Sequence, residues 1–85
     1  MKRDRAAERK RRRERATVIL FTALMEGPLS NAEAMRLMTE NHISTNRQYA
    51  SRMLAPAIKA GEIVAKLDSE GRRYWVLAVN DPDLM

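Results

Sequence analysis

The stretch TNRQYASRMLAPAIKAGEIV, which runs from Thr45 to Val64, decides the fold of this chain. Its apolar residues recur at helical spacing, which predicts a helix with one apolar stripe. Ser44 or Thr45 is expected to cap the start of this helix, and Gly61 is expected to end it. Pro56 removes a backbone hydrogen bond from the helix interior at a cost of about 3 kcal/mol, so we expect a kink or a restart there unless packing favours the bend. The apolar stripe comprises Ala50, Met53, Leu54, Ala57 and Ile58.

After Gly61 the periodicity changes from helical to alternating. Residues 62–68 (EIVAKLD) and 72–79 (RRYWVLAV) flank the short segment SEG, which predicts a β-hairpin with a glycine-containing loop. On the second strand, Trp75 is expected to share one face with Leu77, Val79 and Arg73. Because Leu77 and Val79 are apolar, we interpret Trp75 as a core residue rather than as a platform for stacking bases.

Two further helices are expected before this stretch. Dense apolar residues from about position 15 to position 26 predict a largely buried helix that ends at Gly27. Ser30 and Glu33 have the spacing of a capping box, which predicts the start of a second helix. A short polar turn at residues 39–44 separates the second helix from the third. The order of three helices and a hairpin predicts a mainly α fold with a small β-hairpin, the winged helix-turn-helix.

Positive charge is concentrated at one end of the chain. The 85 residues carry a net charge of +5, and residues 1–15 hold nine basic and three acidic residues. We divide the chain into a basic arm (1–14) that is disordered or partly helical, a winged-helix domain (15–79) and a flexible tail (80–85). Such an arm favours binding to nucleic acid, although a solvated tail that keeps the protein soluble is an alternative. The arm residues expected to contact phosphates are Arg9, Lys10, Arg11, Arg12 and Arg13.

The chain has no cysteine, which excludes disulfides and thiolate metal sites and fits a reducing compartment. The basic start followed by ATVILFTALM (16–25) imitates a secretory signal, but its basic part is long and contains three acidic residues. Ten apolar residues are also too few to span a bilayer, which needs about 20. We expect no membrane association and a cytoplasmic, nucleoid-associated location.

Two segments resemble a known family. SRMLAPAIKAGEIV (51–64) is similar to the Ser-Arg-x-Leu-x-Pro-Leu-x-x-Ala-Gly-x-(Ile/Val) pattern of bacterial winged-helix regulators of the ArsR and MarR type, and EGRRYWVLA (70–78) resembles their wing. The resemblance covers residues 16–78 at fold level and is specific over about 30 residues. It implies that Ser51 and Arg52 face DNA and that Arg72 and Arg73 are wing arginines.

This sequence also departs from the family pattern. Ala57 stands where a leucine is usual, and Glu62 stands where an apolar residue is usual. Neither the cysteine or histidine clusters of metal-sensing members nor long flanking dimerisation helices occur here. We therefore expect no metal site, cofactor or ligand pocket. A homodimer is an open alternative because an isolated domain of this size is marginally stable.

The residues at the start of the third helix suit the reading of bases. Arginine reads guanine with two hydrogen bonds, and asparagine or glutamine reads adenine; an ordinary solvated face is the alternative. Together with the wing pair Arg72 and Arg73, these residues form the expected interface with double-stranded DNA. The third-helix residues are Thr45, Asn46, Arg47, Gln48, Ser51 and Arg52.

The expected function is sequence-specific binding to double-stranded DNA by a small transcriptional regulator, repressor-like and of phage or plasmid type. In the alternative, the arm binds RNA or a protein and the folded part is a scaffold. RKRRRER (9–15) resembles the arginine-rich peptides of phage antitermination proteins, which fold on RNA. We do not expect an enzyme, because no phosphate loop, activated nucleophile or paired carboxylates are recognisable. His42, the single histidine, is expected to be a turn residue.

Overall fold

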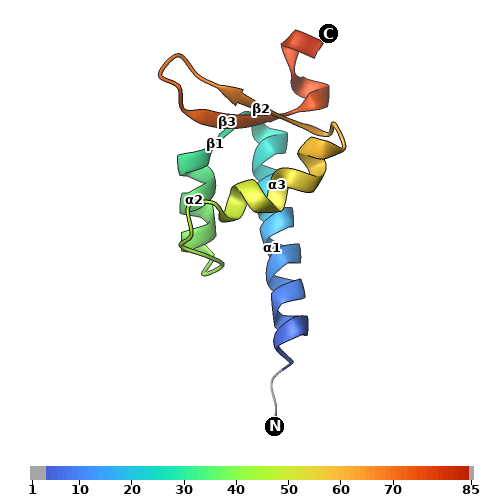
Figure 1. Ribbon diagram of the computed structural model, residues 1–85, viewed down its shortest axis with the longest axis vertical. Coiled ribbons are helices and arrows are strands. Elements are labelled where there is room, and N and C mark those ends of the chain that lie inside the picture. Colours follow the sequence, from blue (N-terminus) through green and yellow to red (C-terminus); the bar gives the residue numbers. More distant parts are fainter. Residues whose placement is uncertain (1–3, 85) are drawn as a thin grey trace.

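The computed structural model describes residues 4–84, the last of them by its backbone alone. Within this range the chain forms three α-helices, a small antiparallel sheet and two short 3-10 turns (Figure 1). This mostly helical arrangement is compatible with the expected winged helix-turn-helix layout. The elements, in chain order, are α1 (Arg5–Glu26), β1 (Leu29–Ser30), α2 (Asn31–Glu40), α3 (Tyr49–Lys59), β2 (Ile63–Leu67), β3 (Arg73–Leu77) and the turns Ala78–Asn80 and Pro82–Leu84.

The sheet has the strand order β1-β3-β2, and both pairings are antiparallel. The β2–β3 hairpin confirms the predicted one, with Ile63 opposite Leu77 and Ala65 opposite Trp75. Strand β1 was not predicted from the sequence, because two residues are too short to show alternation. It pairs Leu29 with Trp75 and so covers the second edge of β3.

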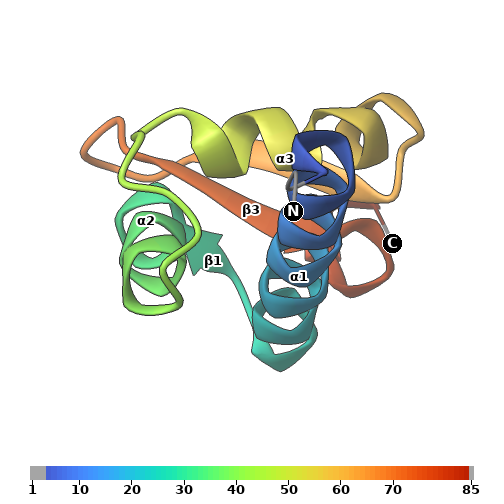
Figure 2. The same ribbon diagram turned by 90° about the horizontal axis from the view of Figure 1, so that it is seen from below.

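The core lies where the helices meet the sheet. Seen from below, α3 packs across both α1 and α2 (Figure 2). Trp75 is fully buried, which confirms its prediction as a core residue. Val79 is 82% exposed, so its predicted place on the inner face of the hairpin is wrong. The reason is that β3 ends at Leu77 and a 3-10 turn replaces the alternation of the strand. The other large, fully buried apolar side chains are Leu20, Leu24, Met38, Leu54 and Ile63.

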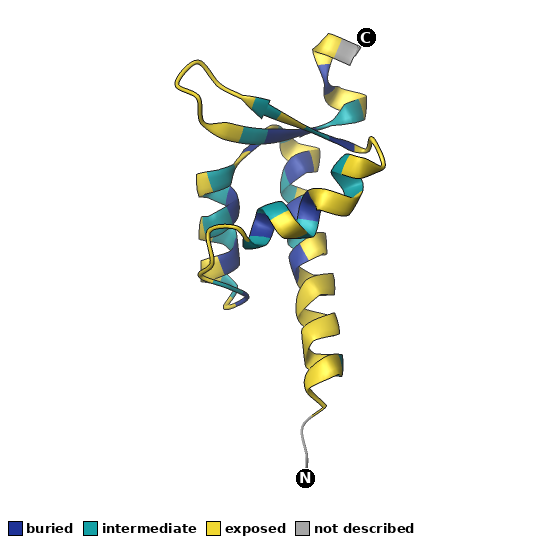
Figure 3. Ribbon diagram, in the orientation of Figure 1, coloured by how far each residue is buried: buried dark blue, intermediate teal, exposed yellow. Residues whose placement is uncertain are grey.

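Helix α1 begins within the basic arm. The Asp4 carboxylate caps it by accepting hydrogen bonds from the amides of Ala6 and Ala7, each at 3.1 Å. Residues 5–14 are therefore helical rather than frayed, while residues 1–3 of the predicted arm lie outside the described residues. These first turns project from the body and are exposed apart from the half-buried Ala7, and the first buried residue is Ala16 (Figure 3). A side-chain cap thus offsets part of the mutual repulsion of the arginines.

Helix α2 begins as predicted. The Ser30 hydroxyl accepts a hydrogen bond from the Glu33 amide at 3.1 Å. The second half of the predicted capping box is replaced, because the Glu33 carboxylate accepts hydrogen bonds from Arg36 instead. His42 lies in the turn that follows α2 with a φ of 56°, so its prediction as a turn residue is confirmed.

Helix α3 begins later than predicted. Its first residue is Tyr49 rather than a residue next to Ser44 or Thr45. The reason is local, because the Asn46 side chain accepts a hydrogen bond from the Gln48 amide at 2.9 Å. Such an Asx turn holds the backbone outside the helix. No side chain caps the helix at Gln48.

The end of α3 follows the expectation more closely. The helix continues through Pro56 to Lys59 without a restart. Gly61 follows with a φ of 80°, the left-handed conformation that ends helices at little cost when the residue is glycine.

The C-terminal residues are more ordered than expected. We expected a flexible tail at 80–85, yet Asp81 is 1% exposed. Its carboxylate accepts a hydrogen bond from the ammonium of Lys66 on β2 at 2.6 Å, and Asp83 accepts another. The hydrogen bond from Lys66 holds the pKa of the Asp81 carboxyl below its ordinary value. A buried carboxylate needs such a partner, so the pair fixes the tail to β2. Met85 lies outside the described residues.

Candidate nucleic-acid interface

The starts of α2 and α3 and the β2–β3 hairpin enclose a depression of about 290 Å³. Beside it lies a second depression of about 430 Å³, which shares Asn31, Arg47 and Arg73 and adds Arg72. The polar lining of the two depressions is called the helix–hairpin face below. It comprises Ser30, Asn31, Arg47, Gln48, Ser51, Asp68, Arg72 and Arg73.

Most of the residues predicted at the third helix and in the hairpin lie on this face, although they are up to 26 positions apart. Thr45 and Arg52 line neither depression, and Arg52 instead donates a hydrogen bond to the Gln48 side chain at 3.3 Å. Asn46 lies in the loop, where its side chain is used by the Asx turn. Arg47 precedes α3, so its predicted place on the helix is wrong for the reason given above.

One hydrogen bond joins the two halves of the face. The guanidinium of Arg73 on β3 donates to the hydroxyl of Ser51 on α3 at 3.4 Å. Arg72 forms an ion pair with Glu70 in the hairpin loop, with a nitrogen-to-oxygen distance of 2.9 Å, and both side chains are exposed. Among residues 4–84, Arg47 has neither a hydrogen bond nor an ion pair from its side chain, so all of its donors are available to a ligand.

Asn31 was missed by the sequence reasoning. It is the first residue of α2 and follows the capping Ser30 directly. The first amides of a helix have no partner within it, and the macrodipole makes this end positive. The predicted capping box was the signal that could have brought Asn31 into the interface.

The basic residues of the arm separate into two groups, because the arm is helical. Arg9, Arg12 and Arg13 line a depression together with Tyr49 and Met53 of α3. Positions three and four residues apart share one face of a helix, which explains this grouping. The arm residues predicted to contact phosphates therefore differ in their surroundings, because only some of them lie beside α3.

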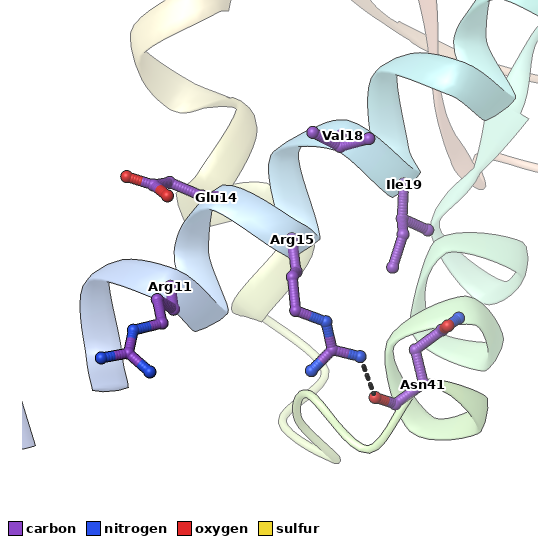
Figure 4. A pocket seen from close by; sticks show the side chains of 6 residues that line it. All are labelled: Arg11, Glu14, Arg15, Val18, Ile19 and Asn41. Carbon is purple, nitrogen blue, oxygen red and sulfur yellow. Dashed lines mark hydrogen bonds between the residues drawn. The ribbon is translucent and has the colours of Figure 1, made fainter. Parts of the chain in front are cut away.

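The second group lies on other sides of α1. Arg11 lines a depression of about 450 Å³ with Val18 and Ile19 (Figure 4), and Lys10 lines another beside Thr17. Arg13 lines this second depression as well, so it borders both groups. Figure 4 also shows the hydrogen bond from the Arg15 guanidinium to the Asn41 carbonyl oxygen, at 3.2 Å. This bond ties α1 to the end of α2.

Arg36 on α2 is occupied within its own helix. Its guanidinium binds the carboxylates of Glu33 and Glu40. The hydrogen bond from Arg36 holds the pKa of the Glu33 carboxyl below its ordinary value. Since two carboxylates surround it, Arg36 is less suited to a phosphate contact than Arg47 or Arg73.

Over residues 4–84, no helix is long and apolar enough to cross a membrane. In the same part of the chain, no group of three or more histidine, aspartate or glutamate side chains could hold a metal ion. Comparisons with protein-family models, with curated proteins and with solved structures found no match to this chain.

Proposed function

We propose that the protein is a sequence-specific, double-stranded DNA-binding regulator of the winged helix-turn-helix class. In this proposal the start of α3 enters the major groove, and the β2–β3 hairpin is the wing. One observation carries the proposal: Arg47, Gln48, Ser51 and Arg73 line one depression although they come from separate elements.

The chemistry of this face suits both parts of DNA recognition. An arginine can donate two hydrogen bonds to guanine, and a glutamine can bind adenine in the same way. Arg47 and Gln48 are exposed and adjacent at the start of α3, where the positive end of the helix dipole also favours a nearby phosphate. We therefore assign base reading to Arg47 and Gln48.

The hairpin supplies contacts of a different kind. Arg72 and Arg73 lie at the exposed start of β3. Arginines that contact phosphates position a protein on the duplex but carry no sequence information directly. The hydrogen bond between Arg73 and Ser51 links the hairpin to α3, so the reading helix and the backbone contacts can engage one duplex together.

The experiment begins with selection of a preferred site from random duplex DNA. The affinities of variants are then measured on the selected and on a random duplex at one salt concentration. Arg47→Ala or Gln48→Ala should cost about 1–3 kcal/mol on the selected duplex and much less on the random one. Arg72→Ala should weaken binding to both duplexes by similar factors, because its contacts are to phosphates.

Arg36→Ala is the matched control. It removes the same charge from an exposed arginine that pairs within α2, away from the helix–hairpin face. Its affinities should stay close to those of wild type. If selection enriches no site, or if hairpin RNA competes better than duplex DNA, the proposal is wrong and the arm-driven RNA or protein module becomes the better account.

A further inference from the structure

A cleft lies between the projecting turns of α1 and the start of α3. Its volume is about 290 Å³, and it is called the arm cleft below. Arg9, Arg12 and Arg13 form the wall from α1, while Tyr49 and Met53 form the wall from α3. Three arginines thus border a space at the lower end of the range for pockets that bind drug-sized ligands, which begins at about 300 Å³.

The three arginines of this cleft are not paired with acidic side chains of the described residues. Within residues 4–84, none of Arg9, Arg12 and Arg13 forms an ion pair with an acidic side chain, whereas Arg36, Lys66 and Arg72 do. Neighbouring cations repel one another, and an anion between them removes that repulsion. The cleft is therefore electrostatically suited to an anion.

The other wall holds an unpartnered donor. The phenol oxygen of Tyr49 is buried and has no hydrogen-bond partner among residues 4–84. A buried hydroxyl without a partner destabilises the folded state, so most such groups are hydrogen-bonded. This donor lies on a residue that also lines the arm cleft, where an anionic oxygen could accept its hydrogen bond.

We infer that the arm cleft binds a phosphate group, held by Arg9, Arg12 and Arg13 and by the hydroxyl of Tyr49. Guanidinium groups match the geometry of phosphate oxygens, and hydrogen bonds to ionised acceptors are among the strongest in proteins. The inference rests on the proposed function in one respect. In that proposal α3 enters the major groove of a duplex, so the nearest phosphates are those of the same duplex. A free oligophosphate presents the same phosphate oxygens and is the second source.

The first test compares two double variants of the full chain. Arg9→Ala with Arg12→Ala alters the arm cleft, whereas Lys10→Ala with Arg11→Ala removes the same charge from other sides of the same helix turns. Alanine preserves helix formation in both. Long-range attraction to DNA falls equally in both variants, so the difference between them measures direct contact.

The affinity for a random 20-base-pair duplex (about two turns of DNA) is measured over a range of salt concentrations. The cleft variant should bind at least about tenfold more weakly than the control variant. Its slope of log K against log salt should also be shallower than that of wild type by about 0.9, which corresponds to the one phosphate contact that is lost. Equal losses of duplex affinity in the two variants, together with unchanged tripolyphosphate binding in the cleft variant, would overturn the inference.

The second test isolates the hydroxyl. Tyr49→Phe removes only the phenol oxygen, and it should weaken duplex binding about tenfold because a hydrogen bond to an ionised group is lost. Its thermal midpoint should be equal to or above that of wild type, since an unpartnered buried donor is removed. Unchanged affinity in Tyr49→Phe would show that the hydroxyl does not touch phosphate.

Titration with tripolyphosphate separates the two sources. Loss of duplex affinity in the cleft variant assigns the arm cleft to the DNA backbone. Loss of tripolyphosphate binding with duplex affinity unchanged assigns it to a free oligophosphate, and loss of neither refutes the phosphate site. The proposed function fails by a separate measurement, when Arg47→Ala leaves the ratio of selected to random affinity unchanged.

Discussion

The indole N–H of Trp75 offers a quantitative test of the core. Trp75 has no exposed surface, and its Nε1 has no hydrogen-bond partner among residues 4–84. In Trp75→Phe the lost ring volume of roughly 40 Å³ costs about 1 kcal/mol as a cavity. The apolar surface that is no longer buried costs about 1 kcal/mol more. Removal of the unpartnered donor stabilises the folded state by about 1–3 kcal/mol. We therefore expect the free energy of unfolding of Trp75→Phe to lie within about 1 kcal/mol of wild type.

Trp75→Ala is the reference variant, with an expected cost of about 3–5 kcal/mol. A chain of this length has a total stability of about 4–13 kcal/mol, so the loss is large enough to measure. The assay is urea denaturation followed by far-UV circular dichroism, because the variants lack the tryptophan fluorophore. If Trp75→Phe loses more than about 2 kcal/mol with an unchanged m value, the indole N–H has a native partner and the offset is wrong.

Two further predictions concern backbone and charge. Gly61→Ala should lower the free energy of unfolding by about 1–2 kcal/mol, because Gly61 has a φ of 80° that strains any residue with a Cβ. An added Cβ meets nothing within 4 Å, so no steric clash contributes. An alanine variant as stable as wild type in urea would contradict this. Because the folded-state pKa of Asp81 is lowered, its pair with Lys66 stabilises the fold above the ordinary pKa of an aspartate, and this stabilisation is lost as the pH falls through the folded-state value. Wild type should therefore lose more of its thermal midpoint between about pH 5 and pH 2 than Asp81→Asn does, and parallel midpoint curves would count against the pair.

The parts of the fold predicted correctly are those with long, regular patterns. The helical spacing after Thr45 and the alternation around Trp75 both lie within single segments, so local sequence is sufficient to recognise them. The start of α3 was predicted wrongly because Ser44, Thr45 and Asn46 can each accept a hydrogen bond from a nearby amide. Only the competition between a helix cap and an Asx turn decides the outcome, and the pattern of residue types is the same for both.

Long-range contacts were beyond the reach of the local patterns. The buried partner of Lys66 is Asp81, 15 residues away, across a loop and a strand. In the candidate site, the order of helices and hairpin was enough to group Arg47 with Arg73. The separation of Arg9 from Lys10 depended on whether the arm is helical. Tyr49 was missed because nothing in the local sequence marks its hydroxyl as unpartnered.

The continuity of α1 gives the molecule a stiff lever. Arg5 and the first buried residue, Ala16, lie on one helix without a break. Eleven residues at a rise of 1.5 Å place the two about 16 Å apart along the axis. A tilt of about 10° at the core would then move the tip by about 3 Å, which is the length of a hydrogen bond. Small repacking around Leu20 and Leu24 is thereby magnified at the tip, so a substitution deep in the core can disengage a distant contact without altering any residue that makes it.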